Sequence, residues 1–199
     1  AINVWDANFK GVWHLKENGG LALDSTVEDN DGTLYPTPVP ISACDATDDW
    51  AGNDLSIDEV DKKEGTGSLE DASPGVPVAL TTYSTTYDPD ESWDWSDKKH
   101  ILLWFKCDRA DGAFDSARLY IYDTGDNWRY WTLTFAAGEW TAVKELLSTG
   151  DDESIAPPNL ALIDYVQVRF VTADNTAFYK KIDYLRIDDK PQWVDGIVN

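Results

Sequence analysis

The stretch YDTGDNWRYW, residues 122–131, concentrates side chains that could bind a ligand around one tight turn. It contains two Tyr, two Trp and one Arg. Turn-forming residues 124–127 separate two runs rich in β-forming residues, which predicts a β-hairpin. Aromatic rings stack on the C–H faces of a sugar ring, and Arg donates hydrogen bonds to hydroxyls. The same side chains could instead fill a core, so the faces of the strands must be assigned first.

Alternation along the strands assigns these faces, because successive side chains of a strand point to opposite sides. Aliphatic and aromatic positions in phase with one another predict a buried set: Leu103, Phe105, Leu119, Ile121, Trp131, Leu133, Phe135, Val166, Val168, Phe170, Leu185 and Ile187. If the strands lie side by side, one open face collects Trp104, Arg118, Tyr120, Tyr130, Gln167, Arg169, Tyr184 and Arg186. Alternation turns Tyr122, Trp128 and Tyr165 outward as well. A register slip of one residue would exchange the two faces.

A face of this composition has three interpretations. Polysaccharide binding is the leading one, because planar donors and aromatic rings together match a sugar. Aromatic residues and Arg are also enriched at protein interfaces, and cross-strand aromatic–Arg pairs stabilise sheets without any ligand. Residues Trp93, Trp95 and Asp97 in SWDWSD could extend the platform or close one end of the barrel.

The elements that must position these residues are β-strands. No apolar period of 3.6 persists for a dozen residues, and short alternating segments are separated by Gly, Asp, Pro and Ser clusters. We expect strands at 55–60, 68–71, 76–82, 100–107, 117–123, 128–135, 141–146, 165–172 and 178–188, with helical turns at 144–147 and 160–164. This pattern predicts an all-β fold, a two-sheet antiparallel β-sandwich or jelly roll.

The chain divides into three parts by composition. Residues 1–40 form an N-terminal extension of orphan strands that ends in the proline tether TPVP (37–40), since alternate prolines favour an extended spacer. Residues 41–190 form the jelly-roll domain, and residues 191–199 form a C-terminal tail.

Four segments of the main domain carry a family resemblance: CDATDDW (44–50), KKEGTGSL (62–69), LLWFKCDRA (102–110) and KIDYLRID (181–188). In order and spacing, residues 44–188 resemble carbohydrate-binding modules of the galactose-binding jelly-roll type. The resemblance implies a polysaccharide or cell-surface glycan as partner. It also implies a structural Ca²⁺ held by Asp45, Glu64 and Asp183, which would join both chain ends to one loop.

The leading stretch VWDANFKGVWHLKENGGLALDSTVEDNDGT (4–33) resembles the opening of laminin-G/concanavalin-type domains. Such a fragment cannot bury its own face, so it must pack on the main domain or on a neighbouring subunit. This motivates an alternative function: a structural subunit of a virion, tail fibre or extracellular filament. Its partners would be other copies of the chain or neighbouring domains.

The overall charge excludes other classes of partner. A net charge of −21 and a pI near 4.1 disfavour nucleic acid and anionic membrane surfaces. The sequence contains no run of 18 apolar residues, so we expect no membrane insertion. We therefore expect an extracellular protein, secreted or displayed on a surface or virion, in which Cys44 and Cys107 could pair or stay reduced.

The sequence gives little support for catalysis. The histidines His14 and His100 have no nucleophile motif near them. A glycosidase needs two opposed carboxylates, but any pair picked from 37 Asp and Glu would be arbitrary. The chain is therefore predicted to be non-catalytic.

Overall fold

A computed structural model describes residues 40–188 of the protein and two short strands before them. The chain divides into two compact units, residues 1–38 and 39–199. In the first unit, β1 (Leu21–Ala22) pairs antiparallel with β2 (Gly32–Thr33). The stretch that resembles a laminin-G domain lies otherwise outside the described residues, as do His14 and the tail 191–199.

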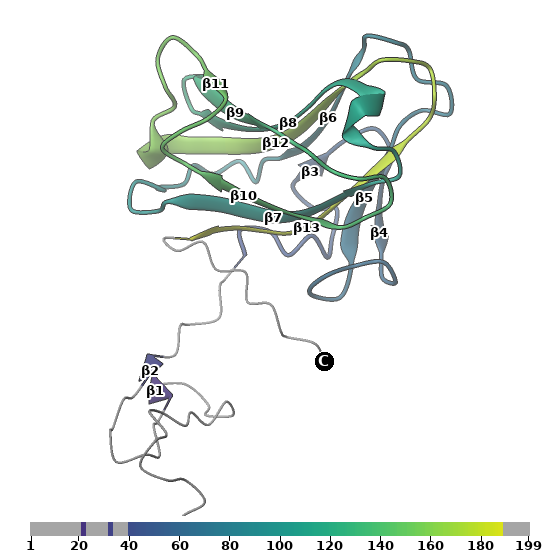
Figure 1. The fold of residues 1–199 in the computed structure, drawn as a ribbon. Helices are drawn as coiled ribbons and strands as arrows, with labels where there is room; N and C mark the ends of the chain where they lie inside the picture. The colour runs from purple at the N-terminus through teal and green to yellow at the C-terminus, as the bar shows by residue number, and fades with distance from the viewer. Residues whose placement is uncertain (1–20, 23–31, 34–39, 189–199) are drawn as a thin grey trace, which may run out of the picture. The chain divides into compact units, whose positions relative to one another are not determined.

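The second unit is a sandwich of two antiparallel sheets (Figure 1). The five-stranded sheet has the order β10 (Thr141–Leu146), β7 (His100–Cys107), β13 (Tyr179–Asp188), β5 (Ser68–Ala72) and β4 (Leu55–Asp58). The six-stranded sheet has the order β11 (Asp152–Glu153), β9 (Trp128–Thr132), β8 (Phe114–Asp123), β12 (Ile163–Thr172), β6 (Thr82–Tyr87) and β3 (Trp50–Ala51). Two single-turn 3₁₀ helices, η1 (Asp111–Ala113) and η2 (Leu160–Leu162), precede β8 and β12.

The predicted all-β, two-sheet antiparallel sandwich is confirmed, and most predicted strands are found within a few residues. The segment 76–82 is the exception, because the strand is β6 at 82–87. Val76 is 75% exposed, and Pro77 has no N–H to donate to a ladder, so this segment is a loop. The helical turn expected at 144–147 is also wrong, since most of that segment belongs to β10.

The core lies between the sheets and contains the predicted buried set. Aromatic rings dominate one region, where Phe105 of one sheet and Phe170 of the other have centroids 5.7 Å apart. Eleven of the twelve residues assigned to the core are buried, and Ile187 packs partly against it. Trp95 is also buried in the core and stacks on Trp93 at 5.5 Å, so this pair closes the sandwich rather than extending a platform.

A buried ion pair of one sheet is hydrogen-bonded to the other sheet. Lys180 Nζ donates to Asp71 Oδ2 over 2.9 Å within the five-stranded sheet, and Thr85 of the six-stranded sheet donates to the same oxygen over 2.5 Å. Each of the three residues is at most 1% exposed. Cys44 and Cys107 are both buried free thiols, and burial raises the pKa of each to about 12.

Candidate functional site

The outer face of the six-stranded sheet presents three rows of planar and polar side chains across β9, β8 and β12. Each row consists of three residues that are cross-strand partners on the three strands. The first row has three aromatic residues, the second is mixed, and the third contains two arginines. In that order the rows are Trp128–Tyr122–Tyr165, Tyr130–Tyr120–Gln167 and Thr132–Arg118–Arg169. We call these nine residues the aromatic face.

The rings stack on one another both within a row and between neighbouring rows. Tyr122 stacks on Tyr165 with centroids 4.3 Å apart and an angle of 15° between the rings, and Tyr120 continues the stack at 5.8 Å from Tyr122. On β9, Trp128 stacks on Tyr130 at 5.7 Å. The face therefore holds two stacks of near-parallel rings, tilted by 48° to one another where Tyr120 meets Tyr130, and these packed rings need little rearrangement to receive a ligand.

Each stack ends in a guanidinium group. The Arg118 guanidinium lies 4.2 Å from the ring centroid of Tyr130, and that of Arg169 lies 4.4 Å from the centroid of Tyr120. Packing of this kind buries Tyr120 to 5% exposure although its side chain is on the outer face. Tyr130, Arg118 and Arg169 remain half-buried and accessible from solvent.

Hydrogen bonds fix the polar part of the face. Arg169 donates to Gln167 Oε1 from Nε over 2.9 Å and from Nη2 over 2.6 Å, and Nη2 also donates to the Tyr122 hydroxyl over 2.7 Å. Gln167 in turn donates to Thr86 Oγ1. Burial raises the pKa of Tyr165 to about 12 and raises that of Tyr122, so both phenols stay protonated and able to donate at neutral pH.

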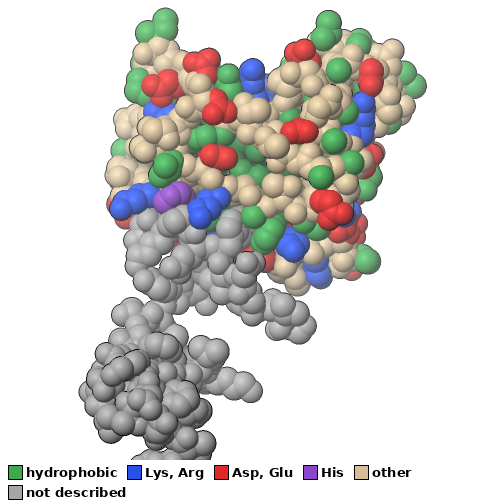
Figure 2. Space-filling view, viewed as in Figure 1, with side chains coloured by type: hydrophobic (Ala, Val, Ile, Leu, Met, Phe, Trp, Pro, Cys, Tyr) green, Lys and Arg blue, Asp and Glu red, His purple; other side chains and the backbone are tan. Residues whose placement is uncertain are grey.

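The surface over this sheet is hollowed. Figure 2, viewed as in Figure 1, shows a depression between two projections above the six-stranded sheet, with a basic side chain (blue) in the depression. A hollow of this kind offers contact area to an extended ligand that a flat or convex sheet would not.

The structure brings together only part of the predicted binding set. Arg118, Tyr120, Tyr130, Gln167 and Arg169 share the aromatic face. The expectation that one face collects all eight residues is wrong, because Trp104, Tyr184 and Arg186 lie on β7 and β13 of the five-stranded sheet.

The surroundings of these three residues differ from those of the aromatic face. Trp104 Nε1 donates to Glu64 Oε1 over 2.9 Å, and Lys63 Nζ lies 4.5 Å from its ring centroid. Tyr184 has a φ of 53° in a β-bulge of β13, and Arg186 is only 2% exposed. Arg186 is therefore turned toward the outer side of its sheet as expected but is covered.

Three further aromatic residues, Trp128, Tyr122 and Tyr165, complete the face and were not among the selected binding residues. Their outward orientation follows from the same alternation, so the signal was present in the sequence. Only the register, which pairs Tyr122 with both Trp128 and Tyr165, shows that they form one row with each other.

The three predicted calcium ligands converge on the loop between β4 and β5. Asp183 Oδ2 accepts hydrogen bonds from the backbone N–H groups of Lys63 and Glu64, over 2.6 and 2.9 Å. Asp45 Oδ1 accepts from the N–H groups of Thr66 and Gly67, over 2.8 and 2.7 Å. The resemblance-based assignment thus selects residues that are neighbours in space although they are far apart in sequence.

Three acidic side chains act on one another at this loop. Burial raises the pKa of Asp183 to about 7 against the hydrogen bonds from Glu64 and Lys63, and the charges of Glu64 and Asp45 add to the rise. Asp183 Oδ1 is buried and accepts no hydrogen bond from the described residues. No group of three or more His, Cys, Asp or Glu side chains within residues 40–188 is already arranged as a metal site. A bound ion would therefore need backbone oxygens as well.

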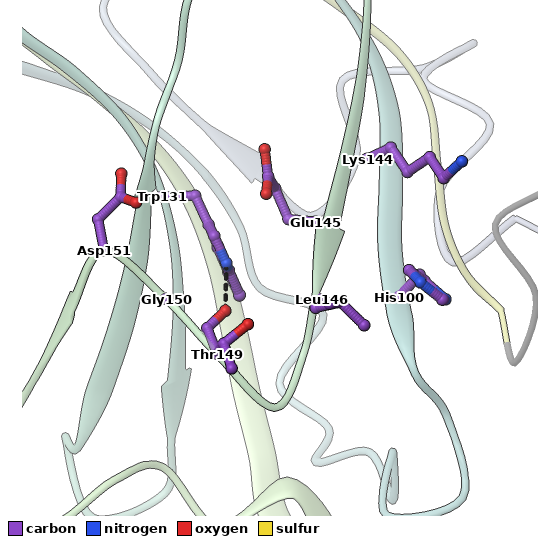
Figure 3. Close-up of a pocket in the computed structure, with 8 residues that line it drawn as sticks. All are labelled: His100, Trp131, Lys144, Glu145, Leu146, Thr149, Gly150 and Asp151. Carbon is purple, nitrogen blue, oxygen red and sulfur yellow. Dashed lines mark hydrogen bonds between the residues drawn. The ribbon is translucent and has the colours of Figure 1, made fainter.

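A separate pocket of about 360 Å³ opens where the edges of the two sheets meet (Figure 3). It is lined by His100, Trp131, Lys144, Glu145, Leu146, Thr149, Gly150 and Asp151. Trp131 Nε1 donates to the carbonyl of Thr149 over 2.6 Å, and Asp151 accepts from the N–H of Thr132 over 2.6 Å. These bonds hold the loop before β11 against β9, and this structural role accounts for much of the lining.

Comparison with known proteins identifies the fold. No protein-family model and no curated protein matches the sequence. Among solved structures, a family 11 carbohydrate-binding module of the Clostridium thermocellum cellulase Lic26A-Cel5E matches with a TM-score of 0.55 at 13% identity, over 81% of this chain and 99% of that chain. A family 30 carbohydrate-binding module matches with a TM-score of 0.52 at 12% identity, over 83% and 90%. The chain has the jelly-roll fold of carbohydrate-binding modules.

Other matches place the same fold inside longer chains or beside a sugar. An exo-β-agarase matches with a TM-score of 0.57 at 15% identity, and the matched part is 24% of the agarase chain. A Clostridium thermocellum family 11 module, solved with a β-1,3-1,4-mixed-linked tetrasaccharide, matches with a TM-score of 0.54 at 15% identity, over 77% and 96%. At these identities the likeness establishes the fold alone.

The described residues include no helix long and apolar enough to cross a bilayer.

Proposed function

We propose that the chain is a non-catalytic carbohydrate-binding module that binds a polysaccharide through the aromatic face. The observation that carries the proposal is the ordered array of rings and guanidinium groups on one hollowed sheet face. Sugar rings would pack their C–H surfaces against the rings, and their hydroxyls would pair with Gln167, Arg118, Arg169 and the tyrosine hydroxyls. An extended polysaccharide suits the face better than a single sugar, because three rows span three strands.

The fold supports the proposal from an independent direction. Modules of this fold include one solved with a bound tetrasaccharide. The proposed location is extracellular, secreted or surface-displayed. The runner-up function, a structural subunit of a virion or filament, was motivated by residues 1–40, which lie mostly outside the described part, and the comparisons do not favour it.

Binding would be tested with the intact chain against mixed-linkage β-1,3-1,4-glucan, agarose, polygalacturonate and a sulfated galactan. Affinity electrophoresis suits this test, because it detects the weak dissociation constants, roughly micromolar to millimolar, that correspond to about 4–8 kcal/mol of binding free energy. Retarded migration in at least one gel is the expected result. Unretarded migration in all four gels at millimolar sugar would contradict the proposal.

We also propose that Ca²⁺ is a structural ion of this protein. Asp45, Glu64 and Asp183 would hold it together with backbone carbonyls of residues 63–65. The ion would neutralise the buried carboxylate of Asp183 and the charges of Glu64 and Asp45 that act on it. Its role would be to tie the first residues of the domain and β13 to the β4–β5 loop.

The calcium proposal is tested by thermal unfolding with millimolar Ca²⁺ and with a chelator. A higher midpoint in Ca²⁺ is expected for the natural chain because a ligand that binds only the folded state stabilises it. Asp183→Asn should remove most of this difference. A midpoint that does not respond to Ca²⁺ in the natural chain would refute the role.

A further inference from the structure

We propose that Arg118 and Arg169 together bind an anionic group of the polysaccharide, a carboxylate or a sulfate ester. This inference rests on the proposed function and names the chemical class of its ligand. It goes beyond the aromatic array, which by itself would accept neutral sugars.

The first observation is the register of the two arginines. Arg118 and Arg169 are direct cross-strand partners on β8 and β12 and lie on the same face of the sheet. Like charges placed directly opposite one another destabilise a pair of strands. An anion bound between the two guanidinium groups would remove this repulsion, and a neutral hydroxyl would not.

The second observation is that neither arginine has a carboxylate partner among the described residues. Arg109 forms a two-point ion pair with Asp174, and Arg129 pairs with Glu153. Arg118, in contrast, makes a single hydrogen bond with described residues, from Nη1 to the Tyr120 hydroxyl over 3.3 Å. In a chain with 37 acidic residues, two adjacent arginines without acidic partners are unexpected unless the anion comes from elsewhere.

The third observation is that Arg169 is already oriented and that both arginines keep N–H groups for an anion. Arg169 is fixed by Gln167 Oε1 and the Tyr122 hydroxyl through Nε and Nη2, which leaves Nη1 without a partner among the described residues. Nε and Nη2 of Arg118 are also without described partners. A guanidinium that is already oriented loses less side-chain entropy when it binds, and its N–H groups match the oxygens of a carboxylate or sulfate.

Charge elsewhere on the chain restricts the ligand further. Asp152 of β11 lies close enough to contribute, after the Tyr120 hydroxyl, to a raised pKa of Arg118. The net charge of −21 repels any polyanion at long range, although salt limits this repulsion to about 8 Å at physiological ionic strength. We therefore expect a polysaccharide with an isolated anionic group that reaches the arginine pair.

The test uses pairs of polysaccharides that differ only in charge: polygalacturonate and its methyl ester, and a sulfated galactan and the same galactan after desulfation. Dissociation constants are measured by titration calorimetry for the natural chain and for Arg118→Gln, Arg169→Gln and Lys144→Gln. Lys144 is the matched control, because it is an exposed cation on β10 of the other sheet. Its variant changes the net charge equally without touching the aromatic face.

The natural chain should bind the anionic member of one pair at least tenfold more tightly than its neutral member, since hydrogen bonds to charged groups are the stronger ones. Each Arg→Gln change should reduce the ratio of the two dissociation constants about tenfold, and Lys144→Gln should leave this ratio unchanged. Preference within the pectin pair identifies a carboxylate, and preference within the galactan pair identifies a sulfate ester.

Other outcomes separate the two proposals. Equal binding of charged and neutral members overturns the anion inference and leaves the carbohydrate-binding function intact. The anion inference is also overturned if the Arg→Gln variants lose the same fold in affinity for the neutral polysaccharide as for the anionic one. Absence of binding to these four polymers overturns the anion inference, and absence of binding to the mixed-linkage glucan and agarose as well refutes the proposed function itself.

Discussion

Breaking the buried ion pair between Asp71 and Lys180 should strongly destabilise the sandwich, because the remaining charge would be left buried without a partner. Asp71 Oδ2 accepts from Lys180 Nζ and Thr85 Oγ1, and its Oδ1 accepts from the N–H groups of Asn53 and Asp54 over 2.8 and 3.1 Å. Burial raises the pKa of Asp71, but the charge of Lys180 and the hydrogen bonds outweigh this and lower it. The carboxylate therefore stays charged beside its partner.

Asp71→Asn keeps the shape of the side chain and removes the charge. Its amide nitrogen or its uncharged oxygen would then face the Lys180 ammonium, which stays 1% exposed. Removal of one partner from a buried pair costs about 3–5 kcal/mol of unfolding free energy. With an m-value of about 2 kcal/mol per molar urea, the unfolding midpoint should fall by about 2 M.

The assay is urea unfolding followed by tryptophan fluorescence, with Asp97→Asn as control because Asp97 pairs with Lys98 at the surface. The control should hardly change the midpoint, since exposed pairs contribute little. The double variant Asp71→Asn with Lys180→Met should lose less than the sum of the two single losses. A midpoint for Asp71→Asn equal to that of the control would refute the reasoning.

Two further predictions concern the β4–β5 loop. Burial raises the pKa of Asp61, but hydrogen bonds from Lys106 and Lys181 outweigh this effect and hold the pKa at about 2, below the ordinary 3.8. The contribution of Asp61 to the free energy of unfolding is therefore complete above pH 3.8 and is lost as the pH falls toward 2. Acid titration of the urea midpoint should show this loss, and Asp61→Asn should flatten it; equal slopes would contradict the assignment. Gly65→Ala should lower the thermal midpoint, because Gly65 has a φ of 63° and an added Cβ would lie 2.7 Å from Asp45 Oδ1. An unchanged midpoint would show that the loop relaxes freely.

Alternation predicted which side chains point inward and which point outward. It could not predict which sheet each strand joins, because a period of two distinguishes the faces of a strand and not its neighbours. Trp104 and Tyr130 are both outward, as expected, yet they lie on opposite outer faces of the sandwich. Strand order depends on contacts between distant residues, and no local pattern encodes it.

Local irregularities were also beyond the sequence. The bulge at Tyr184 lets Ile182 and Leu185 both reach the core although they are three residues apart. Lys180 lies in phase with Ile182, so its inward orientation was available from alternation, but a charged residue in a core is not expected without a visible partner. That partner, Asp71, is 109 residues away.

Comparison of Tyr130→Ala with Trp104→Ala tests the central claim most directly. Both are half-buried aromatic residues that point outward, but from different sheets. A sugar that covers about 100 Å² of a ring contributes about 2.5 kcal/mol at about 25 cal/mol per Å², which corresponds to roughly 60-fold in affinity.

The measurement is the dissociation constant, by titration calorimetry, for whichever of the four polysaccharides retards the natural chain most. We predict that Tyr130→Ala weakens binding at least tenfold and that Trp104→Ala leaves it within twofold, with both variants folded by circular dichroism. Loss of binding in Trp104→Ala with full binding in Tyr130→Ala would place the ligand on the other sheet and contradict the account.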